Sequence, residues 1–167
     1  MKQQVSIEKG VQNTGVMDFS YLLDAPAGKH GFVKVRKGHL YFEDGTSARF
    51  IGFNFPTRAN MPDHETADRI SQRLATMGVN VVRLHAADAL PGDYGWSANP
   101  EYPLINYKSG NSRTLNSAGV ERFDYWVSRL IEKGIYLHVD LLVARAFLEG
   151  DNLDYQESLY ATKSSSH

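Results

Sequence analysis

The sequence contains the same joint between a helix and a strand twice, and this repeat restricts the fold more than any other feature. Gly78 ends an amphipathic segment and leads at once into the apolar run 79–85, and Gly134 does the same before the run 135–143. A glycine just after a helix takes the left-handed conformation that stops the helix. Strands that alternate with helices in this way form a parallel sheet with right-handed crossovers. The repeat therefore predicts an α/β fold.

The two helices are predicted from their caps and from the spacing of their apolar residues. Asp63 is a suitable N-cap residue for the first helix, and Asn116 for the second. Apolar residues recur at helical spacing in both segments. They are Ala67, Ile70, Leu74 and Met77 in the first helix, and Val120, Phe123, Val127 and Leu130 in the second. Each helix thus has one apolar face with which to cover the sheet.

The segment before the first helix is predicted to form a small hairpin that leads into a buried strand. Apolar residues alternate with polar ones from residue 32, and Asp44-Gly45 is a strong signal for a hairpin turn. The run 48–55 that follows is apolar, and Pro56 ends it. We interpret this run as the first strand of the parallel sheet.

Composition and charge exclude several classes of protein and site. The chain has 167 residues, with 18 basic and 19 acidic ones and a net charge of −1, so its charge does not support nucleic-acid binding. It has no cysteine, which excludes disulfides, thiol nucleophiles and cysteine-bound zinc. No apolar run is long enough to span a membrane, and the first residues lack the apolar stretch of a signal peptide. We expect a soluble protein with neither a nucleic-acid nor a membrane partner.

Period-two alternation along the three predicted strands gathers polar side chains on one face of the sheet. Val82 and Leu84 are expected to face the helices, which leaves the polar residues on the other face. These residues are Asn54, Arg83, His85, His138 and Asp140. A buried charge is costly unless it is paired or functional, and polar residues at the carboxyl ends of barrel strands usually carry the chemistry. We expect them to bind substrate, and a solvated or salt-bridged face is the alternative.

A long loop separates the second strand from the second helix. It extends from Ala86 to Leu115, and a loop of this length within a domain is usually functional or disordered. Disordered tracts contain few aromatic residues, whereas this loop contains Tyr94, Trp96, Tyr102 and Tyr107. Their rings are suited to stack on sugar rings, and ordinary loop packing is the alternative. Asp88 lies near the expected rim of the site.

Several of these segments resemble the cellulase-like glycoside hydrolases of clan A, near family five. The runs 38–45 and 49–55 resemble the hairpin and first strand with which their (β/α)₈ barrel begins. The run 74–85, which ends in Gly-Val-Asn-Val-Val-Arg-Leu-His, resembles their second strand, and Arg83 matches the arginine beneath the catalytic site. The run 134–140 resembles their third strand.

The resemblance implies a fragment of a glycoside hydrolase that acts on β-linked polysaccharide. The implied fold is a partial TIM-type barrel, truncated after the third strand. Its implied divisions are a lead-in at 1–31, the hairpin and partial barrel at 32–150, and a polar, flexible tail at 151–167. The family's two catalytic glutamates end its fourth and seventh strands, so no catalytic residue is assigned. Leu141-Leu142 also stand where the family usually has histidine.

Two other functions remain open from the sequence. The chain is alternatively a carbohydrate-binding module derived from such a barrel. A metal-dependent hydrolase is less favoured, because the first strand lacks the His-x-His of barrel amidohydrolases. Its ligands would be His85, Asp88, His138 and Asp140. We expect no metal or other cofactor, an oligosaccharide or polysaccharide as ligand, and a homo-oligomer, dimer or tetramer, formed through the open sheet edges.

Overall fold

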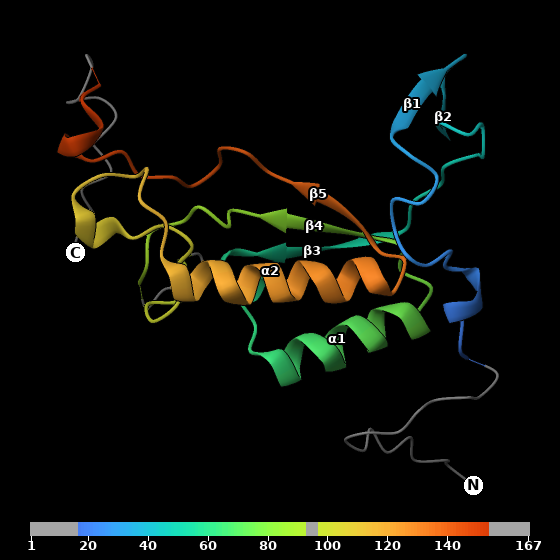
Figure 1. Cartoon of the computed structure of the whole chain (residues 1–167), viewed down its shortest axis with the longest axis horizontal. Helices are drawn as coiled ribbons and strands as arrows, with labels where there is room; N and C mark the ends of the chain where they lie inside the picture. Colours follow the sequence, from blue (N-terminus) through green and yellow to red (C-terminus); the bar gives the residue numbers. More distant parts are fainter. Residues whose placement is uncertain (1–16, 93–96, 154–167) are drawn as a thin grey trace, which may run out of the picture.

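A parallel three-stranded sheet with two helices on one of its faces forms the centre of the molecule (Figure 1). The computed structural model describes residues 17–92 and 97–153. The strands are β3 (Gly52–Pro56), β4 (Val81–His85) and β5 (Tyr136–Val139), in the order β3-β4-β5, and the helices are α1 (His64–Thr76) and α2 (Ser117–Glu132). This arrangement confirms the predicted α/β fold with its parallel sheet.

The predicted caps and stops of the helices are confirmed. The Asp63 carboxylate accepts a hydrogen bond from the Thr66 backbone N–H at 2.7 Å, and the Asn116 side chain accepts one from the Ala118 N–H. Gly78 and Gly134 have φ angles of 72° and 80°, the left-handed conformation that a side chain disfavours. Short 3-10 helices complete the described chain: η1 (Ser20–Leu22), η2 (Thr57–Asn60), η3 (Tyr107–Ser109) and η4 (Glu149–Asp151). Neither α-helix of this part of the chain is long and apolar enough to cross a membrane.

The core lies between the sheet and the helices. It consists of Ala67, Leu74, Val79, Val82, Leu84, Trp126, Leu130 and Ile135. Val82 and Leu84 face the helices, as predicted. Trp126 is fully buried, although the apolar stripe predicted for α2 did not include it. Met77 was wrongly placed on the apolar face of α1, because the helix ends at Thr76 and Met77 is its exposed C-cap.

The hairpin forms a separate antiparallel sheet of β1 (Val33–Arg36) and β2 (His39–Phe42). Its turn lies at Lys37 and Gly38, which both have positive φ, as in a type I′ hairpin turn. The predicted Asp44-Gly45 turn is real, but it connects β2 to the next segment, which makes one antiparallel bridge with β2. The hairpin is therefore confirmed, with a different turn.

The outer strands are more exposed and β5 is shorter than predicted. The Phe53 side chain is 48% exposed and Ile51 is more so, because β3 is an edge strand and only its end packs on the core through Phe55. β5 ends at Val139 and not at residue 143, because its partner β4 ends at His85. The prediction of a buried first strand is thus wrong for most of β3.

His30 connects the lead-in to the hairpin, and we predict that its pKa lies above the ordinary value of 6.5. The Asp24 carboxylate on one ring nitrogen is the main cause, and the Asp44 carboxylate on the other adds to it. Because the pKa is raised in the folded state, this stabilisation is complete below the unfolded value and disappears as the pH rises through the folded value. Asp24 also pairs with Lys29.

An NMR pH titration of the His30 ring measures this pKa. Asp24→Asn should move it back toward the ordinary value without unfolding the chain. A His30 pKa at or below 6.5 in the unmodified protein would show that the two carboxylates do not act on the ring as described.

Candidate functional site

The candidate site is centred on the Asp140 carboxylate, directly after β5. Arg83 contacts both of its oxygens, with Nη2 2.8 Å from Oδ2 and Nε 3.2 Å from Oδ1. His85 Nδ1 lies 2.6 Å from Oδ2, and His138 Nε2 lies 3.7 Å from Oδ1. The Asp140 side chain is only 9% exposed, whereas that of Arg83 is 44% exposed. Four of the predicted site residues therefore form one cluster.

The register of the parallel strands explains this cluster. Arg83 of β4 lies opposite His138 of β5, and Asn54 of β3 lies opposite Arg83 on its other side. Asn54 is exposed and makes no hydrogen bond through its side chain within the described part of the chain. All three side chains belong to the face that the helices leave open.

The electrostatics of the cluster keep Asp140 ionised. The hydrogen bond from His85 is the main cause that lowers its pKa, and the hydrogen bond from Arg83 follows. An anionic Asp140 fixes the orientation of both partners. The site can therefore present guanidinium and imidazole groups to a hydroxyl-rich ligand, but Asp140 is not a free acid or nucleophile.

Asp88, also predicted as a site residue, lies outside this cluster. Its carboxylate accepts hydrogen bonds from the backbone N–H groups of Val143 and Ala144, at 3.0 and 3.1 Å. Its backbone carbonyl accepts one from the Tyr107 hydroxyl at 2.6 Å. Asp88 thus anchors the chain that follows β5 onto the long loop.

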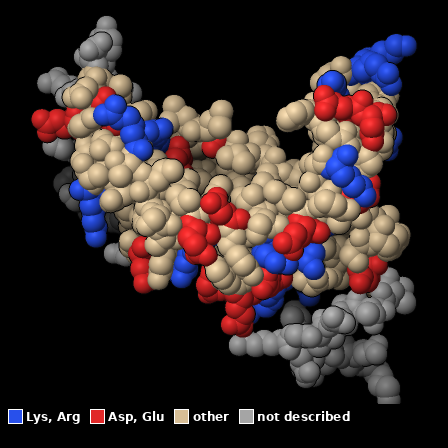
Figure 2. All heavy atoms as spheres, in the orientation of Figure 1, with Lys and Arg blue, Asp and Glu red and all other residues tan. Residues whose placement is uncertain are grey.

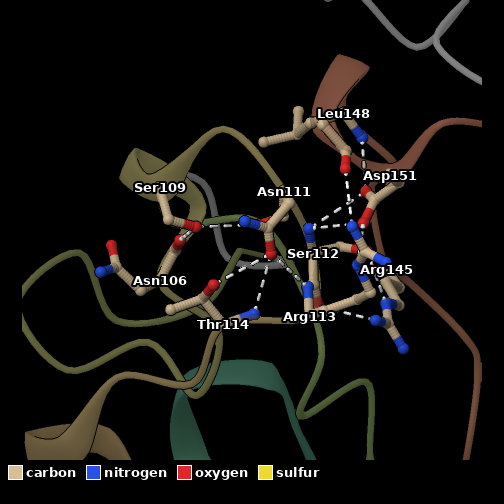
Figure 3. Close-up of polar contacts among 10 residues, drawn as sticks. Asn106, Ser109, Asn111, Ser112, Arg113, Thr114, Arg145, Leu148 and Asp151 are labelled. Atoms are coloured by element: carbon tan, nitrogen blue, oxygen red, sulfur yellow. Dashed lines mark hydrogen bonds and ion pairs between the residues drawn. The ribbon is translucent and has the colours of Figure 1, made fainter.

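A second polar network, which the sequence did not predict, also joins the long loop to the chain that follows β5 (Figure 3). Ser112 lies between Asp151 and Arg145: its N–H donates to both Asp151 oxygens at 3.0 Å, and its carbonyl accepts from Arg145 Nη2 at 2.6 Å. Asp151 is 4% exposed. Burial alone raises its pKa, but the N–H groups of Leu148 and Ser112 together lower it. Asp151, expected at the start of the tail, is therefore anchored by the loop.

The loop aromatics divide into two groups. Tyr94 and Trp96 lie outside the described residues. Tyr102 packs under the Arg122 guanidinium, which is 3.5 Å from its ring centre. The Tyr107 hydroxyl accepts a hydrogen bond from the Ala146 N–H and donates one to Asp88. For these two rings, the structure agrees with ordinary loop packing.

The structure does not support the metal-hydrolase alternative. Within residues 17–92 and 97–153, no three His, Asp or Glu side chains are arranged to hold a metal ion. Two of the four predicted ligands explain why: Asp88 is held by backbone N–H groups, and Asp140 is held by Arg83.

Comparisons with known proteins agree with the fold. No family model and no curated protein matches the chain. Among solved structures, a glycoside hydrolase family 5 protein from Bacteroides vulgatus ATCC 8482 matches with a TM-score of 0.50 and 18% sequence identity. The fold is that of a partial (β/α) barrel. The match covers 70% of this chain and 25% of the Bacteroides chain, so this chain corresponds to about a quarter of the length of that structure.

Proposed function

We propose that the chain is a carbohydrate-binding section of a glycoside hydrolase barrel, with its sugar site at the carboxyl ends of β4 and β5. One observation carries the proposal: Arg83, His85 and Asp140 are joined by hydrogen bonds on the sheet face opposite the helices. In a (β/α) barrel this end of the sheet faces the substrate. The fold likeness to a family 5 glycoside hydrolase supports a saccharide as the ligand.

The chemistry of these side chains suits sugar hydroxyls. A guanidinium has five N–H donors, and Arg83 uses its Nε and Nη2 groups on Asp140, so donors remain for a ligand. His138 is the most exposed member of the cluster and adds a ring that donates or accepts. Asp140 orients the cluster and does not need to touch the sugar. The sequence resemblance implies a β-linked polysaccharide, and within that class we propose glucan or mannan as the ligand.

Calorimetric titration with cello- and manno-oligosaccharides tests the proposal. Arg83→Ala should weaken binding by about tenfold or more, because a charge-assisted hydrogen bond is lost. Asp140→Asn should also weaken it, by releasing Arg83 and His85. Arg73→Ala is the matched control, since Arg73 lies exposed on α1, and it should bind like the unmodified chain.

Two results would contradict the proposal. One is a lack of detectable binding to any of these oligosaccharides by the unmodified chain. The other is equal affinity for Arg83→Ala and the unmodified chain, once circular dichroism has shown that the variant is folded. Trp96→Ala remains a prediction from the sequence: it should weaken binding if the ring stacks on a sugar.

A further inference from the structure

We infer that one face of the hairpin is a second, separate site, which binds an acidic sugar through its carboxylate. We call it the hairpin basic face and define it as Lys34, Arg36, His39, Tyr41, Ser47 and Arg49. The strand register places these side chains together. Residues that lie opposite each other in an antiparallel pair point to the same side, and the pairs here are Lys34 with Tyr41, Arg36 with His39, and Tyr41 with Ser47.

The face is concave where β2 meets the segment after it. A hollow of about 320 Å³ is lined by His39, Leu40, Tyr41, Ser47, Ala48 and Arg49. Leu40 and Ala48 alternate along the chain with the other four lining residues, and Ala48 is buried. The walls of the hollow thus carry an imidazole, a phenol, a hydroxyl and a guanidinium. Figure 2 shows Lys and Arg at the outer end of this tip of the molecule, with Asp and Glu directly beside them.

The hairpin neutralises only part of the positive charge of this face. Residues 33–49 contain four Lys or Arg and two acidic residues, although the whole chain has a net charge of −1. Both acidic residues are already paired: Glu43 neutralises Lys34 of this face at 2.9 Å, and Asp44 pairs with His30, which leaves Arg36 and Arg49 of the face. Arg49 makes no ion pair or hydrogen bond through its side chain within residues 17–92 and 97–153. A carboxylate in the hollow would supply the missing partner.

The shape and the aromatic content favour a sugar acid over a nucleic acid. The hollow has room for a sugar ring. Ser47 and His39 line it and can form hydrogen bonds with the hydroxyl groups of the sugar. Binding of single-stranded nucleic acid uses open aromatic faces for base stacking. The larger of the two rings here, Tyr41, has the Arg36 guanidinium 4.7 Å from its centre, so one of its faces is already covered.

This site lies apart from the Asp140 cluster. The hairpin packs near the start of β5, where Phe42 stacks on Tyr136 at 5.2 Å between ring centres, whereas Asp140 follows the end of that strand. In Figure 1 the hairpin rises at the end of the sheet opposite the strand tips. Failure of one site therefore does not imply failure of the other.

Calorimetric titration with a trimer of galacturonic acid tests the inference. We expect binding that weakens as ionic strength rises, because the contacts are exposed and ionic. The methyl-esterified trimer, which lacks the charge, should bind at least about tenfold more weakly. Arg49→Gln should cause a similar loss, and Arg73→Gln, an exposed arginine on α1, should not.

The possible outcomes separate the two sites and the two ligand classes. Loss of binding in Arg49→Gln but not in Arg83→Ala supports the inference. Equal binding of the charged and esterified trimers would overturn it, as would no binding of the charged trimer to the unmodified chain. Tighter binding of a thymidine oligonucleotide than of the galacturonic acid trimer would assign the face to nucleic acid and overturn it as well.

Discussion

The 167-residue chain alone is expected to show no robust glycosidase turnover. A retaining glycosidase needs two carboxyl groups about 5–5.5 Å apart, one as nucleophile and one as acid/base. In the described part of the site, Asp140 is bound by Arg83 and His85, and Asp88 is bound by two backbone N–H groups. The lowered pKa of Asp140 also prevents it from serving as an acid near neutral pH.

Reducing-sugar assays on β-glucans and mannans measure this. The turnover number for the release of reducing ends should stay far below the ordinary enzyme range of about 1–10³ per second. Turnover within that range, lost in Asp140→Asn or Asp88→Asn and retained in an exposed control such as Asp124→Asn, would contradict the expectation. It would also show that the carboxylates of this cluster are less constrained than their hydrogen bonds indicate.

We also expect the chain to self-associate. Among the residues that the structure describes, β3 and β5 are the edge strands of the central sheet, and the hairpin forms its own sheet and pairs with neither of them. Apolar residues are exposed just after the end of β5, where Leu141 is 89%, Leu142 61% and Val143 46% exposed. Open edges and exposed apolar surface favour pairing with another copy, and symmetric dimers are the commonest result.

Light scattering coupled to size exclusion at micromolar concentration measures the assembly. We expect a dimer or tetramer, and Leu141→Lys should shift it toward the monomer by placing a charge beside the edge. Leu115→Lys is the control, because Leu115 is also an exposed leucine, at 58%, but lies just before the N-cap of α2 and away from the sheet edge. A mass of 18.7 kDa for the unmodified chain would contradict the prediction.

Local signals in the sequence were enough to predict the central fold. The caps at Asp63 and Asn116 and the glycines at 78 and 134 act within a few residues of their positions, so their effect does not depend on the rest of the chain. The extent of burial depends on neighbours that the sequence does not reveal. For this reason β3 was predicted to be buried but is largely exposed.

The candidate site was predictable where the strand period determines it. Alternation placed Arg83, His85, His138 and Asp140 on one face, and the parallel register then brought them into contact. Contacts between loops follow no period. The anchoring role of Asp88 and the burial of Asp151 against Ser112 therefore became visible only in the folded chain.

Chemical-shift mapping with cellotetraose and mannotetraose tests the central claim most directly. The account predicts that one of these sugars shifts the backbone amide signals of Arg83, His85, His138 and Asp140 in a saturable way, and that the outer faces of α1 and α2 do not respond. Saturable shifts confined to the helices or the hairpin, or no shifts at millimolar sugar, would contradict a carbohydrate site at the carboxyl ends of β4 and β5.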